Sequence, residues 1–446
     1  MRIIDIKNVG WVSITLIVSI LSIVGCDKVT VVGDKDVDTG TGSVPRSVGP
    51  EEPTPPEEPT PPEEPGPPEQ PIDPVFPDDL ASGSPILLSL NDVNGDGIQD
   101  ISVIVEDSTN EKLTAIVKDT NSDAINIIPF IGNSRLLSAI TLPDINGDLA
   151  MELAVFFRHQ STGDLKVEIR NPLSGLLIRE IRFNSNLQFL FTSAVGDMTG
   201  DGYPELAVLF RGKDASRDRL FAQIRDPLSG ALVINVDFDH HVAAKGFLAI
   251  PDINASGTPE LLLLAETSNG VFRSVIRDAQ SSALVSNKRL GSQFTVKQLT
   301  IAPNRGGNLI EEIAALREER SLSVLLYHAH DGTQSNVVNF NPSFQSQKLL
   351  IVTDVNDNGA LELAVLGQNP RTGVVKSEVR DARTGDLLNN VLWPTAYKPV
   401  DTVTIADINL NGSQELAYLG QSESDGKLVV VVKDSLTSEL MGTVDF

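Results

Sequence analysis

Short apolar stretches alternate with polar loops over the last four-fifths of the chain, and the alternation repeats. From about residue 85 to the end, three features recur about every 50 to 55 residues: an apolar segment, a loop of the form D-x-N-x-D-G-x-x-E, and a segment beginning Leu-Ala-Val. A second polar stretch follows each loop by about twenty residues, as in IRNPLSG and VRDARTG. Its Gly and Asp content between β-branched residues is typical of a hairpin turn. Periods of this length indicate a repeat architecture.

Each repeat contains enough alternating segments for four strands. In the second copy these segments are LLSAITL, ELAVFFR, LKVEIR and LLIREIRF. Four strands in about fifty residues make one propeller blade, and one blade needs neighbours to bury its inner strands. Seven repeats fit residues 81–446. The pattern therefore predicts an all-β fold, a seven-bladed β-propeller with four-stranded antiparallel blades. An open solenoid or several small sandwiches is the alternative.

The first 25 residues have a different pattern, which predicts a signal peptide. Arg2 and Lys7 precede an apolar run from Trp11 to Val24, which is short for a membrane span. The run ends in Ile-Val-Gly followed by Cys26, and this ending resembles the bacterial lipoprotein box, which implies lipidation at Cys26. An uncleaved anchor is the alternative. Both interpretations predict a membrane-attached protein of the bacterial cell envelope that faces the periplasm or the exterior.

Residues 26–80 predict a disordered linker between this anchor and the repeats. Fourteen of the 27 prolines lie between Pro45 and Pro77, in near-repeats such as PEEPTP. Proline fixes φ and removes backbone donors, and the paired glutamates repel one another, so we expect an extended polyproline II segment. A spacer role fits this composition better than a proline-rich ligand motif does.

Charge and cysteine content narrow the possible partners. The chain carries 60 Asp and Glu against 35 Lys and Arg, a net charge of -25, which disfavours nucleic acid because phosphates would be repelled. Divalent cations would be attracted instead. Cys26 is the single cysteine, so no disulfide framework can form. Outside the cytoplasm, packing, bound metal or both must therefore stabilise the protein.

The repeated loop has the chemistry of a calcium site. Side-chain oxygens at positions 1, 3, 5 and 9, with a carbonyl at position 7, give a hard cation about six ligands once water is added. Calcium tolerates such a flexible carboxylate shell, and glycine at position 6 allows the chain to wrap around the ion. The alternative is that Asp, Asn and Gly merely form turns. The repetition favours metal binding, with three to six Ca²⁺ ions in all.

The loops differ in how many ligands they keep. The first and third combine three carboxylates with the glycine and are the best candidates. Their ligand positions are Asp92, Asn94, Asp96 and Asp100, and Asp197, Thr199, Asp201 and Glu205. The second keeps three carboxylates, although Leu149 replaces the glycine. Its ligand positions are Asp144, Asn146, Asp148 and Glu152.

The remaining loops have fewer carboxylates, which predicts weaker binding. The sixth and seventh keep the glycine and two carboxylates each. Their ligand positions are Asp354, Asn356, Asn358 and Glu362, and Asp407, Asn409, Asn411 and Glu415. The fourth is weaker again. Its ligand positions are Asp252, Asn254, Ser256 and Glu260. The fifth, from Asn304 to Glu312, has lost most ligands and is expected to be only a turn.

These repeats resemble the FG-GAP and VCBS families, whose best-known relatives are the N-terminal β-propellers of integrin alpha chains. The resemblance rests on the nine-residue loops at Asp92, Asp197 and their counterparts and covers about 360 residues. The Phe-Gly and Gly-Ala-Pro marks of FG-GAP repeats are mostly absent. The resemblance implies calcium in the loops between the first two strands of each blade, and a binding or adhesion scaffold.

Evidence for catalysis is sparse in the sequence. A metal site could be built from His328 and His330, or from residues 237–241, but the first pair falls in a degraded hairpin turn. No nucleophile elbow, P-loop or zinc-protease motif occurs. We therefore predict a non-catalytic calcium-binding β-propeller lipoprotein for adhesion, or for binding protein or polysaccharide at the cell envelope. A polysaccharide lyase-like enzyme is the alternative. Such an enzyme would need a basic or tyrosine catalyst in a cleft, and the chain has only four tyrosines: Tyr203, which lies in a predicted calcium loop, Tyr327, Tyr397 and Tyr418.

Overall fold

The computed structural model describes the repeat region with a few gaps. The described residues are 84–107, 112–120, 126–212, 219–238, 242–292, 296–302, 312–318 and 321–446. The predicted signal peptide, Cys26 and the proline-rich linker lie outside them, as does most of the fifth loop. Within the described residues no helix is long and apolar enough to cross a membrane.

Twenty-eight strands in the described residues form seven antiparallel sheets of four. Blades 1 to 4 are β1–β4 (Ile86–Ser89, Asp100–Asp107, Lys112–Asp119, Asn126–Pro129), β5–β8 (Ser134–Leu142, Glu152–His159, Leu165–Arg170, Leu177–Phe183), β9–β12 (Leu187–Val195, Glu205–Gly212, Leu220–Arg225, Leu232–Asp237) and β13–β16 (Val242–Ile250, Glu260–Thr267, Val271–Asp278, Leu284–Ser292). Blades 5 to 7 are β17–β20 (Val296–Ala302, Glu312–Glu318, Leu322–His328, Gln334–Asn339), β21–β24 (Gln345–Val352, Glu362–Gln368, Val375–Asp381, Leu387–Trp393) and β25–β28 (Tyr397–Ile405, Glu415–Ser422, Leu428–Asp434, Leu440–Asp445).

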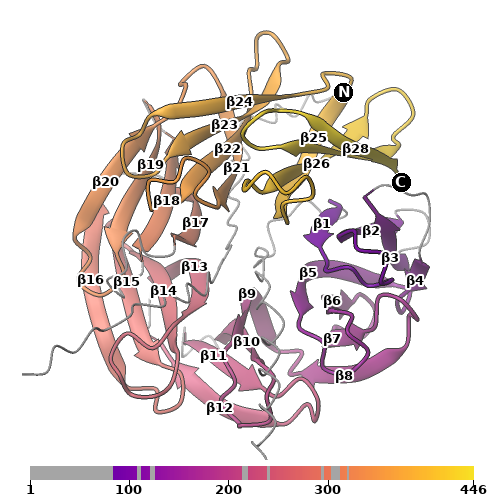
Figure 1. Cartoon of the computed structure of the whole chain (residues 1–446). Coiled ribbons are helices and arrows are strands. Elements are labelled where there is room, and N and C mark those ends of the chain that lie inside the picture. Colours follow the sequence, from indigo (N-terminus) through magenta and orange to yellow (C-terminus); the bar gives the residue numbers. More distant parts are fainter. Residues whose placement is uncertain are drawn as a thin grey trace, which may run out of the picture. The chain divides into compact units, whose positions relative to one another are not determined.

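The seven sheets form a closed ring (Figure 1). The first strand of each blade contacts the first strand of the next, and β25 contacts β1. Every blade is made of consecutive strands, so no strand is exchanged where the ring closes. The predicted seven-bladed β-propeller is therefore confirmed, and the open solenoid is wrong because the last blade packs on the first.

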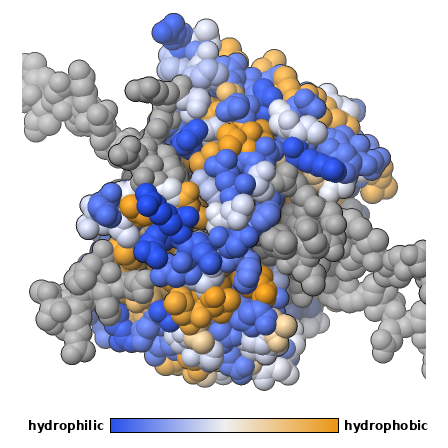
Figure 2. Space-filling model, turned by 90° about the vertical axis from the view of Figure 1, so that its left-hand side faces the viewer, coloured by the Kyte–Doolittle hydropathy of each residue, from blue (hydrophilic) through white to orange (hydrophobic). Residues whose placement is uncertain are grey.

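Burial across a blade explains the hydrophobic pattern of its strands. The second strand lies between two neighbouring blades, so both of its faces are apolar, and the first six residues of β6 are buried. The outermost strand is covered on one face only, and β8 alternates between exposed and covered positions. Figure 2 shows the resulting outer surface near β16 and β20, where hydrophilic side chains surround separate apolar patches.

Apolar clusters fill the interfaces between blades. At the closure, Leu87, Ile101 and Val103 of blade 1 pack with Val403 and Ile405 of blade 7 in one buried cluster. Contact between the faces of adjacent sheets, rather than pairing of their edges, therefore closes the ring.

A carboxylate adds polar contacts at the same closure. Asp401 accepts a hydrogen bond from the backbone N–H of Leu87 at 3.0 Å through Oδ2, and its Oδ1 lies 2.6 Å from Lys348 Nζ. Asp401 belongs to β25, Leu87 to β1 and Lys348 to β21. One carboxylate thus joins three consecutive inner strands.

Candidate calcium loops

Six described loops connect the first and second strands of their blades, and they share one backbone conformation. The predicted position 6 has positive φ throughout, including Leu149 at 73°, so the leucine keeps the shape that glycine gives elsewhere. Position 4 also has positive φ, which the loop pattern does not predict. It is glycine in the first three loops, but Ala255, Asp357 and Leu410 adopt φ of 57° to 59° in the fourth, sixth and seventh. Left-handed backbone costs a non-glycine residue roughly 1–2 kcal/mol.

The first aspartate of each loop binds the loop's own backbone. Asp92 accepts hydrogen bonds from Gly95 N at 2.6 Å through Oδ1 and from Gly97 N at 2.6 Å through Oδ2. Asp144 does the same with Gly147 and Leu149. Burial alone would raise the pKa of Asp144, but the backbone N–H donors outweigh it and lower the pKa. These aspartates fix the turn, and an ionised carboxylate in this position has lone pairs left for a cation.

The ninth residue is a buried carboxylate at the start of the second strand. Its first oxygen accepts a hydrogen bond from the backbone N–H of loop position 2 in every described loop, as in Val93 N to Asp100 Oδ2 at 2.9 Å and Ile145 N to Glu152 Oε2 at 2.9 Å. In the other four loops the same hydrogen bond runs from Met198 N to Glu205, from Ile253 N to Glu260, from Val355 N to Glu362 and from Ile408 N to Glu415.

Burial raises the pKa of these ninth residues, and in all of them except Glu205 nearby carboxylates raise it further. The pKa rises to about 7 for Asp100, Glu260 and Glu415. It rises to about 8 for Glu152 and Glu362. A bound cation would remove this penalty, because an opposite charge favours the ionised form.

The second oxygen of the ninth residue separates the loops into two groups. Asp100 Oδ1, Glu362 Oε1 and Glu415 Oε1 are buried and have no hydrogen-bond partner. In contrast, Glu152 Oε1 and Glu260 Oε1 each accept an asparagine amide at 2.6 Å, and Glu205 Oε1 accepts the backbone N–H of Thr199 at 2.9 Å. A buried carboxylate oxygen without a donor is costly, so the first, sixth and seventh loops most need a ligand that the chain itself does not supply.

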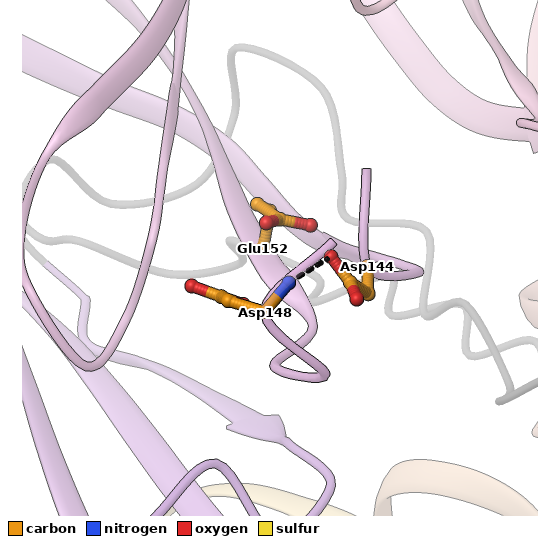
Figure 3. A group of neighbouring side chains, drawn as sticks. All are labelled: Asp144, Asp148 and Glu152. Atoms are coloured by element: carbon orange, nitrogen blue, oxygen red, sulfur yellow. Dashed lines mark hydrogen bonds between the residues drawn. The ribbon is translucent and has the colours of Figure 1, made fainter. Parts of the chain in front are cut away.

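The second loop brings its three carboxylates closest together. One oxygen each of Asp144, Asp148 and Glu152 lies within 4.8 Å of the others, the one such acidic group within the described residues. Figure 3 shows them on a single turn, where Asp148 N donates to Asp144 at 3.2 Å while the Asp148 carboxylate extends to the other side. This spacing suits a cation with oxygen ligands at 2.3–2.6 Å.

A further residue, which the sequence analysis treated only as part of a hairpin turn, contacts the loop in each of these blades. We call it the turn residue, because it ends the third strand or follows it directly. The turn residues of the six blades are Asp119, Asn171, Asp226, Asp278, Asp381 and Asp434. Its first oxygen caps the outer turn, as where Asp278 Oδ1 accepts from Ser281 N at 2.6 Å. The recurring Lys/Arg-Asp/Asn pair at this point was the available signal.

The side chain of the turn residue also reaches the fifth loop position of its own blade. In blade 7, Asn411 Nδ2 donates to Asp434 Oδ2 at 2.8 Å. In blade 4, Ser256 Oγ donates to Asp278 Oδ2 at 2.8 Å. These hydrogen bonds join the inner and outer hairpins of one blade.

The histidines do not assemble into a metal centre in the described residues. His328 ends β19, with Nε2 3.6 Å from Glu312 and Nδ1 3.9 Å from Asp331. The carbonyl of His330 accepts a hydrogen bond from Ser286 of blade 4, which fits a turn. Asp237 pairs with Arg219, while His240 and His241 lie outside the described residues.

Comparisons with known proteins support the fold only. No family model matches the sequence, and no curated protein matches it either. A crystal structure of BBS1N in complex with ARL6DN is similar with a TM-score of 0.51 and 13% identity, covering 82% of this chain and 97% of that one. A prolyl endopeptidase structure gives 0.50 and 9%, covering 81% and 48%.

Weaker structural matches include a carbohydrate-active enzyme. The Bacillus licheniformis rhamnogalacturonan lyase has a TM-score of 0.40 and 14% identity, with 80% of this chain and 71% of that chain covered. The seven four-stranded sheets define the class of the protein as a seven-bladed β-propeller, and at these identities the matches support that fold alone.

Proposed function

We propose that the chain is a non-catalytic, calcium-binding β-propeller with kinship to FG-GAP and VCBS repeats. The observation that carries the proposal is the set of buried carboxylate oxygens without donors at Asp100, Glu362 and Glu415, each at the ninth position of a loop that also holds an ionisable aspartate at position 1. The compact acidic group of the second loop supports the same interpretation. Calcium supplies the missing partner because it accepts several carboxylate and carbonyl ligands in flexible geometry.

The proposed ion positions lie at one end of the ring. All six described loops join first to second strands, and the turns between third and fourth strands lie at the same end of each antiparallel sheet. Calcium would therefore rigidify this rim. We assign recognition of a protein or polysaccharide to the surface loops of the ring, because loops held on a rigid scaffold carry binding in most repeat folds.

We further propose that a lipid on Cys26 and the proline-rich linker hold the propeller at the bacterial cell envelope. The support is the lipoprotein-like sequence before Cys26 and the linker composition between Pro45 and Pro77. Labelling with a radioactive fatty acid tests this assignment, because Cys26→Ser should abolish incorporation. Label retained in Cys26→Ser would contradict it.

Calcium binding is tested by melting the purified chain in calcium and in EDTA. Ions that bind only the folded state raise the free energy of unfolding by about 2.7 kcal/mol per site at a hundredfold excess over Kd. Asp96→Ala and Asp201→Ala should each reduce the calcium-induced rise in Tm. Asp425→Ala, in the β26–β27 turn at the opposite end of blade 7, is the matched control and should leave the rise unchanged. Superimposable curves with and without calcium would refute the proposal.

The non-catalytic part of the proposal is tested with acidic polysaccharides. Lyase action creates an unsaturated product that absorbs ultraviolet light, so its absence over prolonged incubation is the expected result. Turnover that depends on the chain would overturn this part. A pull-down from the host's own envelope, with and without calcium, would then identify the partner bound by the calcium-loaded form.

A further inference from the structure

The contact between turn residue and fifth loop position has complementary chemistry in four blades. In blade 6, Asn358 Nδ2 donates to Asp381 Oδ2, as Asn411 does to Asp434 in blade 7. In blade 2 the residue types are reversed, and Asn171 Nδ2 donates to Asp148 Oδ2 at 2.7 Å. With the hydroxyl of Ser256 in blade 4, each of these blades pairs one carboxylate with one neutral donor.

Blades 1 and 3 break this rule because both positions are aspartate, Asp96 and Asp119 in blade 1 and Asp201 and Asp226 in blade 3. In blade 3 both oxygens of the ninth residue Glu205 accept backbone N–H groups, so of these two blades only blade 1 keeps an unsatisfied ninth-position oxygen. The side chains of Asp96 and Asp119 lie within hydrogen-bond reach of each other. Two ionised carboxylates can only accept hydrogen bonds, so neither supplies the donor that an amide supplies in blades 2, 6 and 7. Like charges at this separation repel, unless a cation or a proton lies between them.

A second observation in blade 1 points to the same missing group. Asp119 is the direct strand partner of Asp100 in the pairing of β2 with β3. Asp100 is 0% exposed, and its Oδ1 has no hydrogen-bond partner. Asp119 thus lies beside Asp96 of the inner hairpin and opposite Asp100, whose buried Oδ1 nothing satisfies, although these three carboxylates are grouped less closely than those of the second loop. The basic neighbour Lys118 is directed elsewhere, and its Nζ donates to the carbonyl of Asp445 in blade 7.

We propose that Asp119 is a ligand of the calcium ion of blade 1, together with Asp96 and Asp100, so that the ion ties the inner loop to the outer turn. Blades 6 and 7 join loop and turn through an amide hydrogen bond, so in those blades this connection does not depend on the ion proposed for their loops. The inference rests on the proposed function, because it requires that the loop of blade 1 takes up calcium. It adds a ligand from outside the nine-residue loop and predicts which blades need metal for internal cohesion.

Other blades of the chain supply the variants for a test. Asp119→Asn gives blade 1 the residue types of blade 2, and Asp381→Asn is the same substitution at the turn position of blade 6. Calcium titration of the full chain by calorimetry should show that Asp119→Asn weakens one site about tenfold or more, since it removes a charged ligand. Asp381→Asn should leave the titration unchanged, because its Oδ2 already accepts Asn356 Nδ2 at 2.9 Å.

Melting in EDTA separates a lost ligand from a misfolded blade. Asp119→Asn should melt no lower than the wild type in EDTA, because an amide donor replaces a repelling carboxylate. Conversely, Asn358→Asp creates an aspartate pair in blade 6 and should lower Tm in EDTA while strengthening one calcium site.

Each alternative outcome has a distinct meaning. Equal calcium affinity in Asp119→Asn and wild type would overturn this inference alone. Equal weakening by Asp119→Asn and Asp381→Asn would assign the turn residue a purely structural role and overturn it as well. A wild-type chain that takes up no calcium would refute the proposed function and, with it, this inference.

Discussion

The loop rim and the interfaces between blades are built in opposite ways. At the rim, buried carboxylates such as Glu362 keep an unsatisfied oxygen, and Leu410 holds a left-handed backbone while 87% exposed. Between blades, apolar side chains are fully buried and hydrogen bonds cross from one sheet to the next, as where Asn389 donates to Ser435 O at 2.9 Å in the next blade. The interfaces hold the ring together, whereas the rim retains strain and charge that a ligand can relieve.

Arginine and lysine side chains reinforce those interfaces without metal. Arg170 of blade 2 lies 5.2 Å from the ring of Phe130, which follows blade 1, and Lys433 of blade 7 lies 5.9 Å from Trp393 of blade 6. Cation–π contacts of this kind each contribute about 0.5–1 kcal/mol at exposed sites. Because the interfaces do not depend on the rim, we expect the ring to remain folded without calcium.

The largest effect should come from truncating a side chain between blades. Phe156 is 0% exposed and its ring centroid lies 5.7 Å from that of Phe189. Phe156→Ala should reduce the free energy of unfolding by about 3–5 kcal/mol, because it leaves a cavity that cannot collapse. Denaturant unfolding measures this loss. The calcium-induced rise in Tm should persist, and its disappearance would show that rim and interface are not independent.

Leu392→Ala is the matched control for that substitution. Leu392 lies on the outermost strand β24 and is 55% exposed. Its truncation should change the free energy of unfolding by about 0.5 kcal/mol or less.

The next largest effect should come from the carboxylate at the ring closure. Asp401→Ala leaves Lys348 without its partner and the Leu87 N–H without an acceptor, so we expect a loss of about 2–4 kcal/mol. Adding Lys348→Met should recover part of this loss in a double-mutant cycle. Additive losses in the double variant would show that the pair does not interact.

The metal-free protein should be more stable at pH 6 than at pH 8. The pKa of Glu152 and Glu362 rises to about 8 in the folded state, above the usual 4.5, mainly because of burial. The folded state therefore binds more protons between these values, and stability falls as pH rises through the folded pKa. Melting in EDTA across this range tests the direction.

Calcium should weaken or reverse that pH dependence, because it binds the ionised carboxylates and is favoured as pH rises. The double variant Glu152→Gln, Glu362→Gln is the control, and its slope in EDTA should be flatter than that of the wild type. A stability that rises with pH in EDTA would contradict the assignment of raised pKa values to these buried groups.

The smallest effect should come from relieving backbone strain at the rim. Leu410 has φ of 57°, and its exposed side chain buries little apolar surface that truncation could remove. Leu410→Gly should therefore raise the free energy of unfolding by about 1 kcal/mol or less. The same change at Leu392, in the interior of β24, should lower it by about 1 kcal/mol. If Leu410→Gly instead weakens binding of the protein or polysaccharide partner without changing stability, the exposed leucine contributes to that binding.

Much of the fold was predictable because each blade repeats one local pattern. In the second repeat, the predicted strand LKVEIR coincides with β7, and ELAVFFR lies within β6. Alternation, turn residues and period are local properties of sequence, and seven copies reinforced them. The loops were correctly placed between first and second strands, and the hairpin turns between third and fourth.

The candidate site was only partly predictable. The ninth-position carboxylates were identified, but their burial and the unsatisfied oxygen of Asp100 depend on packing between blades. The turn residue Asp119 lies about twenty residues from its loop, and only the pairing of β2 with β3 brings it opposite Asp100. The positive φ at position 4 escaped notice because Ala255 and Leu410 give no sign of it.

The sequence by itself determined the number of blades, the strands within each blade and the chemistry of the loops, because short-range periodicity and turn composition specify them. Only the tertiary structure decided that Asp401 links three inner strands. It also decided that the turn residue Asp434 faces the amide of Asn411 in blade 7, whereas Asp119 faces a second carboxylate, Asp96, in blade 1. Such pairings depend on strand register and on the packing of one sheet against the next, which bring together residues that no local pattern connects.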